Sequence, residues 1–337
     1  MKLKPLLCLT IAVIGLSQSA CAADPMPEET ASASYLLVGN KGDDSISFIN
    51  LGTGREEARR LVSAKAPHEI AASPDGGTYA AVVNYGSAAI DIFDVKARTI
   101  IQTYDLGENK NPHGIVWLND GRIFATTEGG KSIIIISNAD NFRDRKVSSI
   151  STGQDGTHML AVSSDGKYVY TANLGSGTLS KIDVANNVAL KTVPAGKAPE
   201  GIDITNDNQE IWVSARGSNE VYIYDADTLT ELATIPVGNF PLRLAISPDG
   251  MKAVTSNLAD GTLSVLDINS RKLERVIKVS GSNQAAQVTV IFSPDGRRLY
   301  VAETGINKIA EIDFETGELL GRLAGSIQGD GLAIVTP

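Results

Sequence analysis

Cysteine and histidine are the scarcest reactive residues of this 337-residue chain, which holds two of the first and three of the second. Both cysteines, Cys8 and Cys21, lie within the first 22 residues. If that segment is removed, the remaining chain has no thiol. This excludes disulfides, cysteine-ligated metal sites and covalently attached haem of the c type (haem c). Stability must then come from packing alone.

Positive charge is also scarce, because the chain has 30 lysines and arginines but 39 acidic residues, which gives a formal net charge of −9. Proteins that bind nucleic acids or anionic membranes usually carry clusters of lysine and arginine, so we expect neither as a partner. After the N-terminal region no run of eighteen apolar residues occurs, so we expect no membrane span. The segment GKSI at residues 130–133 lacks the glycine spacing of a phosphate loop, so we expect no nucleotide.

Residues 1–22 have the pattern of a secretory signal peptide. Two lysines precede an apolar run over residues 5–16, and small residues around Cys21 offer a cleavage site. We therefore expect a periplasmic or secreted protein, with residues 23–34 as a polar, disordered lead-in. Acylation of Cys21, which would anchor a lipoprotein, is the alternative. It is disfavoured because Gln18 stands where such signals usually carry leucine.

From Tyr35 onward the chain repeats one unit. A turn motif of the type SPDG recurs every 42 to 46 residues, with its aspartates at Asp75, Asp120, Asp165, Asp207, Asp249 and Asp295. A second series of strand-like segments, such as AIDIFD and TLSVLD, recurs at a similar interval. Together the two series give seven copies of a unit of about 43 residues, a period typical of solenoids and β-propellers.

Each unit contains short runs rich in Val, Ile, Tyr and Thr that alternate with polar residues and end at Gly, Asn or Asp, which predicts four β-strands. Four strands in a unit of this length make a β-propeller blade. The segment YLLVGN matches the second strand of a unit, and residues 329–335 match the first. We therefore predict, over residues 35–337, an all-β fold. It is a seven-bladed β-propeller with four antiparallel strands per blade, and the C-terminal strand closes the ring by pairing with the N-terminal three.

The segments YVYTANLGSGTLSKIDV and RLYVAETGINKIAEIDFETGELL resemble the YVTN family of β-propeller repeats, named for a Tyr-Val-Thr-Asn motif. The resemblance covers residues 35–337, with degenerate motifs such as YLLVGN and AVTSN. It implies an exported β-propeller, since the family includes surface-layer and periplasmic proteins. Lactonases and the haem-d1 domain of cytochrome cd1 share the architecture, but a shared fold does not transfer an activity.

All three histidines occupy the same position of the repeat. His68, His113 and His158 each stand five residues before a turn motif, where the inner strand of a blade begins at the mouth of the central channel. The equivalent residues in the other units are Glu200, Leu242, Val288 and Asp330. Ring closure makes Asp330 a neighbour of His68, so the expected arc runs Asp330, His68, His113, His158, Glu200.

Neighbouring blades bring three such imidazoles close enough to share an ion at the roughly 2.0–2.1 Å of a zinc–nitrogen bond, and zinc or copper suits imidazole ligands. The second strands end at the same mouth, on Asn40, Asn84, Glu128, Asn173, Arg216, Asn257 and Glu303. We predict a metal site of His68, His113 and His158, with Glu128, Glu200 and Asp330 as further ligands or as acceptors for the outer ring nitrogens. Glu128 is also the candidate catalytic base. Arg216 and Arg243 are expected to pair with Glu200 or Glu303, or to grip an anion.

Several functions fit these residues. The leading hypothesis is a monomeric binding protein that presents the metal site to an unknown protein or small-molecule ligand. A metal-dependent hydrolase, lactonase or lyase would use the same arc, so whether the chain is an enzyme stays open. A histidine–carboxylate site without metal, or a cell-surface scaffold with an inert, wet mouth, would also carry polar residues there. Haem d1 with one axial histidine is disfavoured, because short, acidic mouth loops offer little to bind a haem's carboxylates.

Overall fold

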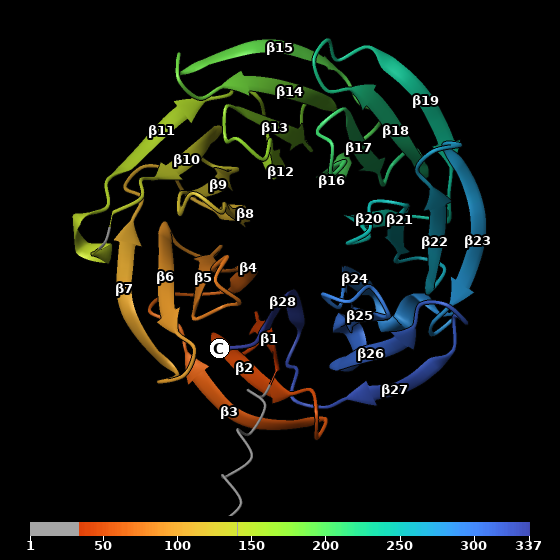
Figure 1. Cartoon of the computed structure of the whole chain (residues 1–337), viewed down its shortest axis with the longest axis horizontal. Coiled ribbons are helices and arrows are strands. Elements are labelled where there is room, and N and C mark those ends of the chain that lie inside the picture. Colours follow the sequence, from red (N-terminus) through yellow and green to blue (C-terminus); the bar gives the residue numbers. More distant parts are fainter. Residues whose placement is uncertain (1–33, 140) are drawn as a thin grey trace, which may run out of the picture. The chain divides into compact units, whose positions relative to one another are not determined.

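The computed structural model describes residues 34–139 and 141–337 and arranges them as seven four-stranded antiparallel sheets around a central channel (Figure 1). The predicted signal peptide, residues 1–22, lies outside the described residues, as does the predicted lead-in apart from Ser34. Within the described ranges no helix has the length and apolar character that crossing a bilayer requires. In the described part of the chain, three single-turn 3-10 helices lie in the connections between strands, namely η1 (Phe142–Asp144), η2 (Asn283–Ala285) and η3 (Thr304–Ile306).

Each sheet is one blade, and we number the blades 1 to 7 in chain order from the sheet that contains β1. The inner strands are, in that order, β28 (Gly329–Val335), β4 (Pro67–Ala72), β8 (Pro112–Trp117), β12 (Thr157–Val162), β16 (Pro199–Ile204), β20 (Pro241–Ile246) and β24 (Gln287–Phe292). The second strands are β1 (Tyr35–Asn40), β5 (Tyr79–Asn84), β9 (Ile123–Thr127), β13 (Tyr168–Asn173), β17 (Glu210–Ala215), β21 (Lys252–Asn257) and β25 (Arg298–Glu303).

The outer half of each blade follows the same order. The third strands are β2 (Ser45–Asn50), β6 (Ala89–Asp94), β10 (Ser132–Ile136), β14 (Thr178–Asp183), β18 (Glu220–Asp225), β22 (Thr262–Asp267) and β26 (Lys308–Asp313). The outer strands are β3 (Arg55–Leu61), β7 (Thr99–Asp105), β11 (Val147–Ser151), β15 (Val188–Pro194), β19 (Glu231–Pro236), β23 (Lys272–Lys278) and β27 (Leu319–Leu323). The predicted fold is therefore confirmed in blade number, strand number and strand direction.

The closure of the ring is also confirmed. In blade 1 the sheet order is β28-β1-β2-β3, and β28 pairs antiparallel with β1 from Tyr35 opposite Val335 to Asn40 opposite Gly329. The last strand thereby covers the edge that β1 would otherwise expose, which removes a site for unwanted strand pairing.

The turn motif works as its residues suggest. In blade 2 the Ser73 hydroxyl donates to the Asp75 carboxylate, which also accepts from the backbone N–H of Thr78 at 3.1 Å. Gly76 takes the left-handed conformation that the turn requires, with φ of 93°. A turn of this type follows the six inner strands from β4 to β24 on the face opposite the histidines.

The hydrophobic core is divided among the blades. Seven clusters of buried side chains each fill the space between two neighbouring sheets. Between blades 1 and 2, for example, Phe48 and Leu37 pack with Val82 and Phe93. Since this packing holds the blades side by side, the inner strands are free to present polar residues to the channel.

Candidate functional site

The three histidines lie side by side at one mouth of the channel. They are the second residues of β4, β8 and β12 and are almost fully buried, with 8%, 2% and 5% of their surface exposed. The ring centroids of His68 and His113 are 4.0 Å apart, and those of His113 and His158 are 3.7 Å apart. His113 therefore lies in the middle, with a neighbouring imidazole against each of its faces.

A β-bulge turns this position toward the channel. In blade 3 the register runs from Pro112 opposite Thr127 to Ile115 opposite Ala125, so that one extra residue of β8 falls beside His113. Every inner strand shows a register shift at the same place. A bulge re-aims the side chain that it contains, which explains why seven equivalent residues converge on one mouth.

Glycine lets the inner strands approach each other beneath the mouth. A Cβ atom at Gly201, which follows Glu200, would lie 2.5 Å from the backbone oxygen of Leu242 and 2.6 Å from the amide nitrogen of Leu244. At Gly114, which follows His113, it would meet the neighbouring β12 strand. Packing thus requires glycine at these two positions, whereas the equivalent position in other blades is occupied by Glu69, Met159, Arg243 and Thr289.

The predicted carboxylates flank the outer histidines. His68 Nε2 lies 3.2 Å from Asp330 Oδ2, and His158 Nε2 lies 3.1 Å from Glu200 Oε1. Glu128 contacts His158 Nδ1 through Oε1 and accepts a 2.8 Å hydrogen bond from the Tyr85 hydroxyl through Oε2. The arc of five residues thus lies in the expected order around the ring.

The donor atoms fall into two overlapping groups, each with atoms within 4.8 Å of one another. One group is His68, Glu69 and His113, and the other is His113, Glu128 and His158. Among the described residues, no such group joins all three histidines. The geometry therefore offers two His-His-Glu sets that share His113. Glu200 and Asp330 belong to neither set and contact the outer histidines instead.

Arg243 forms the floor beneath the histidines. Its guanidinium, which is buried, crosses the channel from blade 6 and donates to Glu69 Oε1 from Nη2 at 2.6 Å and to Glu200 Oε1 from Nη1 at 3.0 Å. Arg216 pairs with Glu200 Oε2 at 2.6 Å, while Glu303 pairs with Arg322 instead. Both arginines thus pair with Glu200, as expected for a structural role, rather than standing free to bind an anion.

Burial and nearby charges shift the pKa values of two neighbouring histidines in opposite directions. Burial and the nearby charges of His158 and His68 hold the pKa of His113 well below its usual value, so His113 is neutral at pH 7. Burial also opposes the charged form of His158, but the carboxylates of Glu128 and Glu200 outweigh it and raise the pKa of His158. In Glu200, burial raises the pKa, but contacts with His158, Arg243 and Arg216 lower it to about 2.

Each of the three histidines has one buried nitrogen without a hydrogen-bond partner among the described residues. In His158 this atom is Nε2, which has Glu200 Oε1 at 3.1 Å as an ion-pair partner. In His68 and His113 it is Nδ1, which accepts or donates no hydrogen bond within the described chain. Leaving a buried polar atom unsatisfied costs about 1–3 kcal/mol. Neutral imidazole is also the form that binds a metal ion, so these atoms are suited to that role.

The sequence-based account of the mouth contains one error. The second strand of blade 3 ends at Thr127, so Glu128 is the first residue of the following turn, equivalent to Lys41, Tyr85 and Arg216. The four strand-final asparagines bond inside their own sheets, as Asn173 does to Ser180 at 2.9 Å. The prediction placed the ends of β9 and β17 one residue too late, at Glu128 and Arg216 instead of Thr127 and Ala215. It therefore treated Glu128 and Arg216 as equivalent to the strand-final asparagines and Glu303.

Three polar residues around the mouth, Lys41, Tyr85 and Glu69, were missed, as were the apolar lining residues Leu174, Phe240 and Leu258. Lys41 and Tyr85 follow the strand-final asparagines directly, so a corrected alignment of the repeats would have found them. Lys41 contacts Asp330. Glu69 stands next to His68 in a strand, where alternation would point it away from the channel, and only the bulge brings both inward. No sequence signal marks that bulge.

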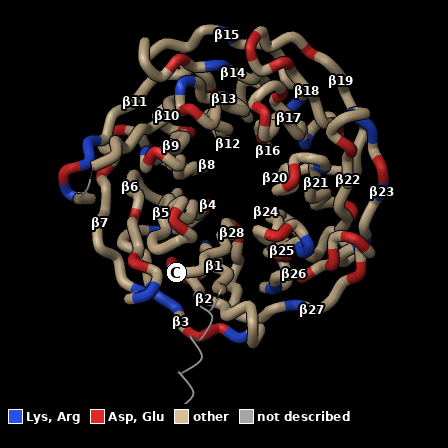
Figure 2. The backbone as a smooth tube through the Cα atoms, viewed as in Figure 1, with Lys and Arg blue, Asp and Glu red and all other residues tan. Residues whose placement is uncertain are grey.

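The mouth encloses a pocket of about 370 Å³. Its lining residues are Lys41, His68, Tyr85, His113, Glu128, His158, Leu174, Glu200, Arg216, Phe240, Leu242, Arg243, Leu258, Val288 and Asp330. Charges of both signs are spread around the ring as a whole (Figure 2), but only this pocket among those described gathers histidines.

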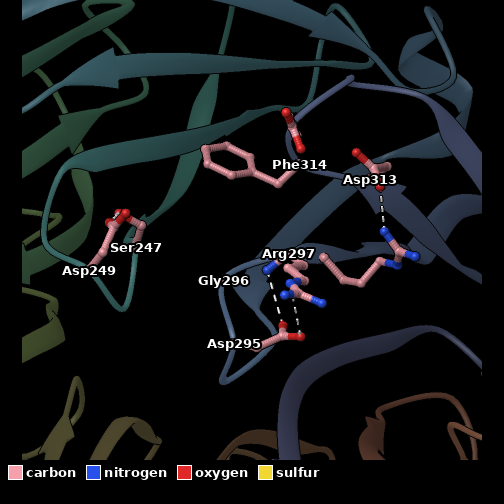
Figure 3. Close-up of a pocket in the computed structure, with 9 residues that line it drawn as sticks. Ser247, Asp249, Asp295, Gly296, Arg297, Asp313 and Phe314 are labelled. Carbon is pink, nitrogen blue, oxygen red and sulfur yellow. Dashed lines mark hydrogen bonds and ion pairs between the residues drawn. The ribbon is translucent and has the colours of Figure 1, made fainter.

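A pocket of about 500 Å³ lies between the turns of blades 6 and 7 (Figure 3). Its charged groups are already used to hold the backbone or each other. Asp295 accepts from Ser293 and from the Arg297 amide, and Arg298 Nη1 bonds Asp313 Oδ2 at 2.5 Å. We therefore assign that pocket to the turn architecture rather than to chemistry.

Comparison with known proteins gives a family and many structural neighbours. The sequence pattern of the family described as "Cytochrome D1 heme domain" matches residues 118–317, which is more than half of the chain. The uncharacterized protein YwhL of Bacillus subtilis (strain 168) is 33% identical over 183 residues, which make up 54% of this chain and 38% of that protein. The match thus spans well under half of the length of YwhL.

Three solved structures illustrate the fold. A functionally unknown protein from Desulfotomaculum acetoxidans superposes with a TM-score of 0.75 at 16% identity over 90% of this chain and 99% of its own. Hydrazine synthase of Kuenenia stuttgartiensis gives 0.71 at 20% identity over 89% and 99%. The dihydro-heme d1 dehydrogenase NirN, in complex with DHE, gives 0.64 at 12% identity over 89% and 74%. At these identities the likeness shows the fold alone.

Proposed function

The chain belongs to the Cytochrome D1 heme domain family, and within it we propose a ligand-binding β-propeller whose channel mouth holds a divalent transition-metal ion. The N-terminal sequence pattern supports export, so we place the protein in the periplasm or outside the cell. Membership of the family does not fix this function, because the residues of the mouth decide what binds there.

The state of His113 carries the proposal. This side chain is 2% exposed, neutral at pH 7, and buried with its Nδ1 unpartnered between two other imidazoles. A histidine that served only packing would be expected to hydrogen-bond both nitrogens or to be replaced by an apolar residue, as the equivalent positions Leu242 and Val288 are. A metal ion supplies the missing partner.

The donor set favours zinc or copper. Each group offers two imidazoles and one carboxylate, which are ligands that both ions accept. The carboxylates of Asp330 and Glu200 contact the outer histidines and would orient their rings. With the ion bound at His113, Glu128 or Glu69 would complete the set from one side.

The family name raises haem d1 as a cofactor, and the described residues fit it poorly. The three cationic side chains that line the pocket already pair with carboxylates, Lys41 with Asp330, Arg216 with Glu200, and Arg243 with Glu69 and Glu200. None is free to bind the carboxylates of a haem. A pocket of about 370 Å³ is also near the lower end of the roughly 300–1,000 Å³ range of ligand sites, and a tetrapyrrole is a large ligand.

An enzyme is the second candidate, and the number of donors favours it over a closed metal carrier. Two histidines and one glutamate leave one position of a tetrahedral zinc ion open, as in catalytic zinc sites. That position would face the pocket. A water molecule held there would become acidic and could attack an ester or lactone, and with Glu69 as the carboxylate ligand Glu128 would be available as the base. This candidate requires the same metal site.

The test of the proposal is metal binding by protein purified without a histidine tag. Zinc and copper are titrated calorimetrically into the apo protein, and metal content after dialysis is measured by elemental analysis. We expect one tightly bound ion in the natural chain and a loss of at least about 100-fold in affinity for His113→Ala, the ligand shared by both groups.

Val288→Ala provides the matched control, since Val288 is the equivalent residue of blade 7 and offers no donor atom. It should bind the ion like the natural chain. Equal metal content in the natural chain and in His113→Ala would refute the metal site. A shift of the Soret band on adding haemin, abolished in His113→Ala, would favour the haem cofactor over the ion.

A further inference from the structure

The mouth pocket has two chemically different sides. The histidines lie on blades 2, 3 and 4, and blades 6 and 7 stand across the channel from blade 3 (Figure 1). On blades 6 and 7 the pocket is lined by Phe240, Leu242, Leu258 and Val288, which we call the apolar wall, and by Arg243, whose buried guanidinium pairs with Glu69 and Glu200. A ligand on an ion at His113 would extend toward this wall.

Phe240 is the most unusual member of the wall. It precedes β20 with φ of 59°, a left-handed conformation that is strained for a bulky residue, and it is 38% exposed. The equivalent position is also left-handed in the other blades, where the residues are Ala66, Asn111, Gly156, Ala198, Ala286 and Gln328. Only blade 6 carries an aromatic ring there.

Packing alone does not account for this ring. Arg216 lies over it, with the guanidinium carbon 5.3 Å from the ring centroid, but that guanidinium is already fixed by its ion pair with Glu200. Phe240 therefore adopts a strained backbone conformation and exposes apolar surface at the mouth. Strain and exposure together at a pocket rim point to a ligand.

The charge of the pocket indicates what part of the ligand meets the ion. Three carboxylates and three cationic side chains line it, and Glu69 lies beneath, so the acidic and basic side chains other than the histidines leave about one excess negative charge. A bound divalent ion would make the net charge of these groups positive. The cations are all paired, so the ion is the strongest free attraction for an anionic group.

Building on the metal site proposed above, we propose that the mouth binds a small organic carboxylate with an apolar body, such as an aryl or alkyl carboxylate. Its carboxylate takes the open position of the ion at His113, and its apolar body packs on Phe240, Leu258 and Val288. Leu242, which is buried, supports the wall from behind. The pocket of about 370 Å³ suits a molecule of that size.

The experiment compares phenylacetate with acetate on the zinc-loaded full-length protein. Both probes are titrated calorimetrically, and the cobalt-substituted protein reports coordination of the carboxylate through its visible spectrum. Both carboxylates should perturb that spectrum. Phenylacetate should bind at least about tenfold more tightly than acetate, because one well-placed apolar group is worth roughly 10- to 200-fold.

Phe240→Ala is the main variant, because alanine already occupies the equivalent left-handed position at Ala66, Ala198 and Ala286. It should fold, keep its zinc and bind acetate normally, but lose most of the preference for phenylacetate. Leu258→Asn should reduce the preference in the same way. Leu61→Ala, on the far outer strand β3, is the control and should change nothing.

The outcomes separate the two proposals. If zinc binds but phenylacetate and acetate bind equally, or if Phe240→Ala and Leu258→Asn both keep the preference, the ligand class is wrong and the metal site stands. If phenylacetate binds as tightly without zinc, the carboxylate does not use the ion and this inference is overturned. If zinc itself does not bind, the proposed function fails and this inference fails with it.

Discussion

The two halves of the channel mouth differ in chemistry although the backbone treats them alike. The arc from blade 1 through blade 5 presents Asp330, three histidines and Glu200, whereas blades 6 and 7 present Leu242 and Val288 at the same position. The same bulge occurs in all seven blades. The fold therefore tolerates apolar residues there, and it does not require the buried polar arc.

Two sets of buried polar residues in the repeats differ in how their polar atoms are bonded. The strand-final asparagines are also buried and repeated, but each bonds inside its sheet, as Asn40 does to Ser47 at 2.8 Å and Asn257 to Ser264 at 2.9 Å. Their polarity serves the fold. The histidines of the mouth leave buried nitrogens unpartnered, which costs free energy unless a ligand binds. Buried polar residues that bond within their own sheet therefore indicate a structural role, whereas those with unpartnered atoms indicate a binding site.

The largest expected effect comes from removing the cation under the arc. Arg243→Met leaves Glu69 buried without its arginine partner and takes from Glu200 one of its two arginines, and breaking a buried ion pair costs roughly 3–5 kcal/mol. Leu242→Met, one residue away on the apolar side, should cost less than about 1.5 kcal/mol. Urea unfolding of both variants measures the difference. Equal losses would show that the two halves are energetically alike.

Acid should weaken the polar arc through Glu200. Its pKa is 4.5 in the reference state and about 2 in the folded protein, so the unfolded chain binds the proton first. The stabilisation is complete above pH 4.5 and is lost as the pH falls through about 2, a total of about 3 kcal/mol.

Glu200→Gln cannot titrate and should lack this part of the pH dependence. We expect the free energies of unfolding of the natural chain and of the variant to differ most above pH 5 and to converge near pH 2. Parallel curves across that range would mean that Glu200 is not held ionised by its neighbours.

Backbone crowding gives the next effect in size. Gly201→Ala places a methyl group against the backbone of Leu242 and Leu244 and should cost about 1–3 kcal/mol by forcing β16 and β20 apart. Gly321→Ala on β27 meets no atom within 4 Å and serves as the control, with a change within about 0.5 kcal/mol. Thermal unfolding compares them. Tolerance of Gly201→Ala would refute the close approach of these strands.

The smallest expected effect tests position rather than residue type. Val288→His places a fourth histidine in the repeat position of blade 7, which is half-buried and lies across the channel from His113. Stability should change by less than about 1 kcal/mol and zinc affinity by less than about threefold, since the new donor comes from a blade that contributes to neither His-His-Glu group. Calorimetry measures the affinity. A large gain would mean that the ion lies at the channel centre.

The repeats made the fold readable in detail. The turn aspartates and the strand periods gave the number of blades, and the match of residues 329–335 to a first strand gave the closure. The gathering of His68, His113 and His158 followed from that ring alone. These predictions succeeded because each depends on a spacing that recurs many times, so that one misread segment does not alter the result.

The details of the mouth could not be read in the same way. Glu69 faces inward only because a bulge precedes Ile70, and a bulge is a shift in pairing that leaves no mark in a single sequence. The reach of Arg243 across the channel depends on side-chain conformation. The division of the donors into two groups depends on ångström-scale differences between blades, which a repeat pattern treats as identical.

One consequence of the closing strand is that the seam of the ring and one end of the polar arc depend on the same pairing. Asp330 lies on β28 and meets His68 of β4, while β28 is held in blade 1 by its pairing with β1. Local opening of that pairing would therefore separate Asp330 from His68 and unlatch the ring in a single step. His113 and His158 lie on blades whose strands are consecutive in sequence, so they would keep their places.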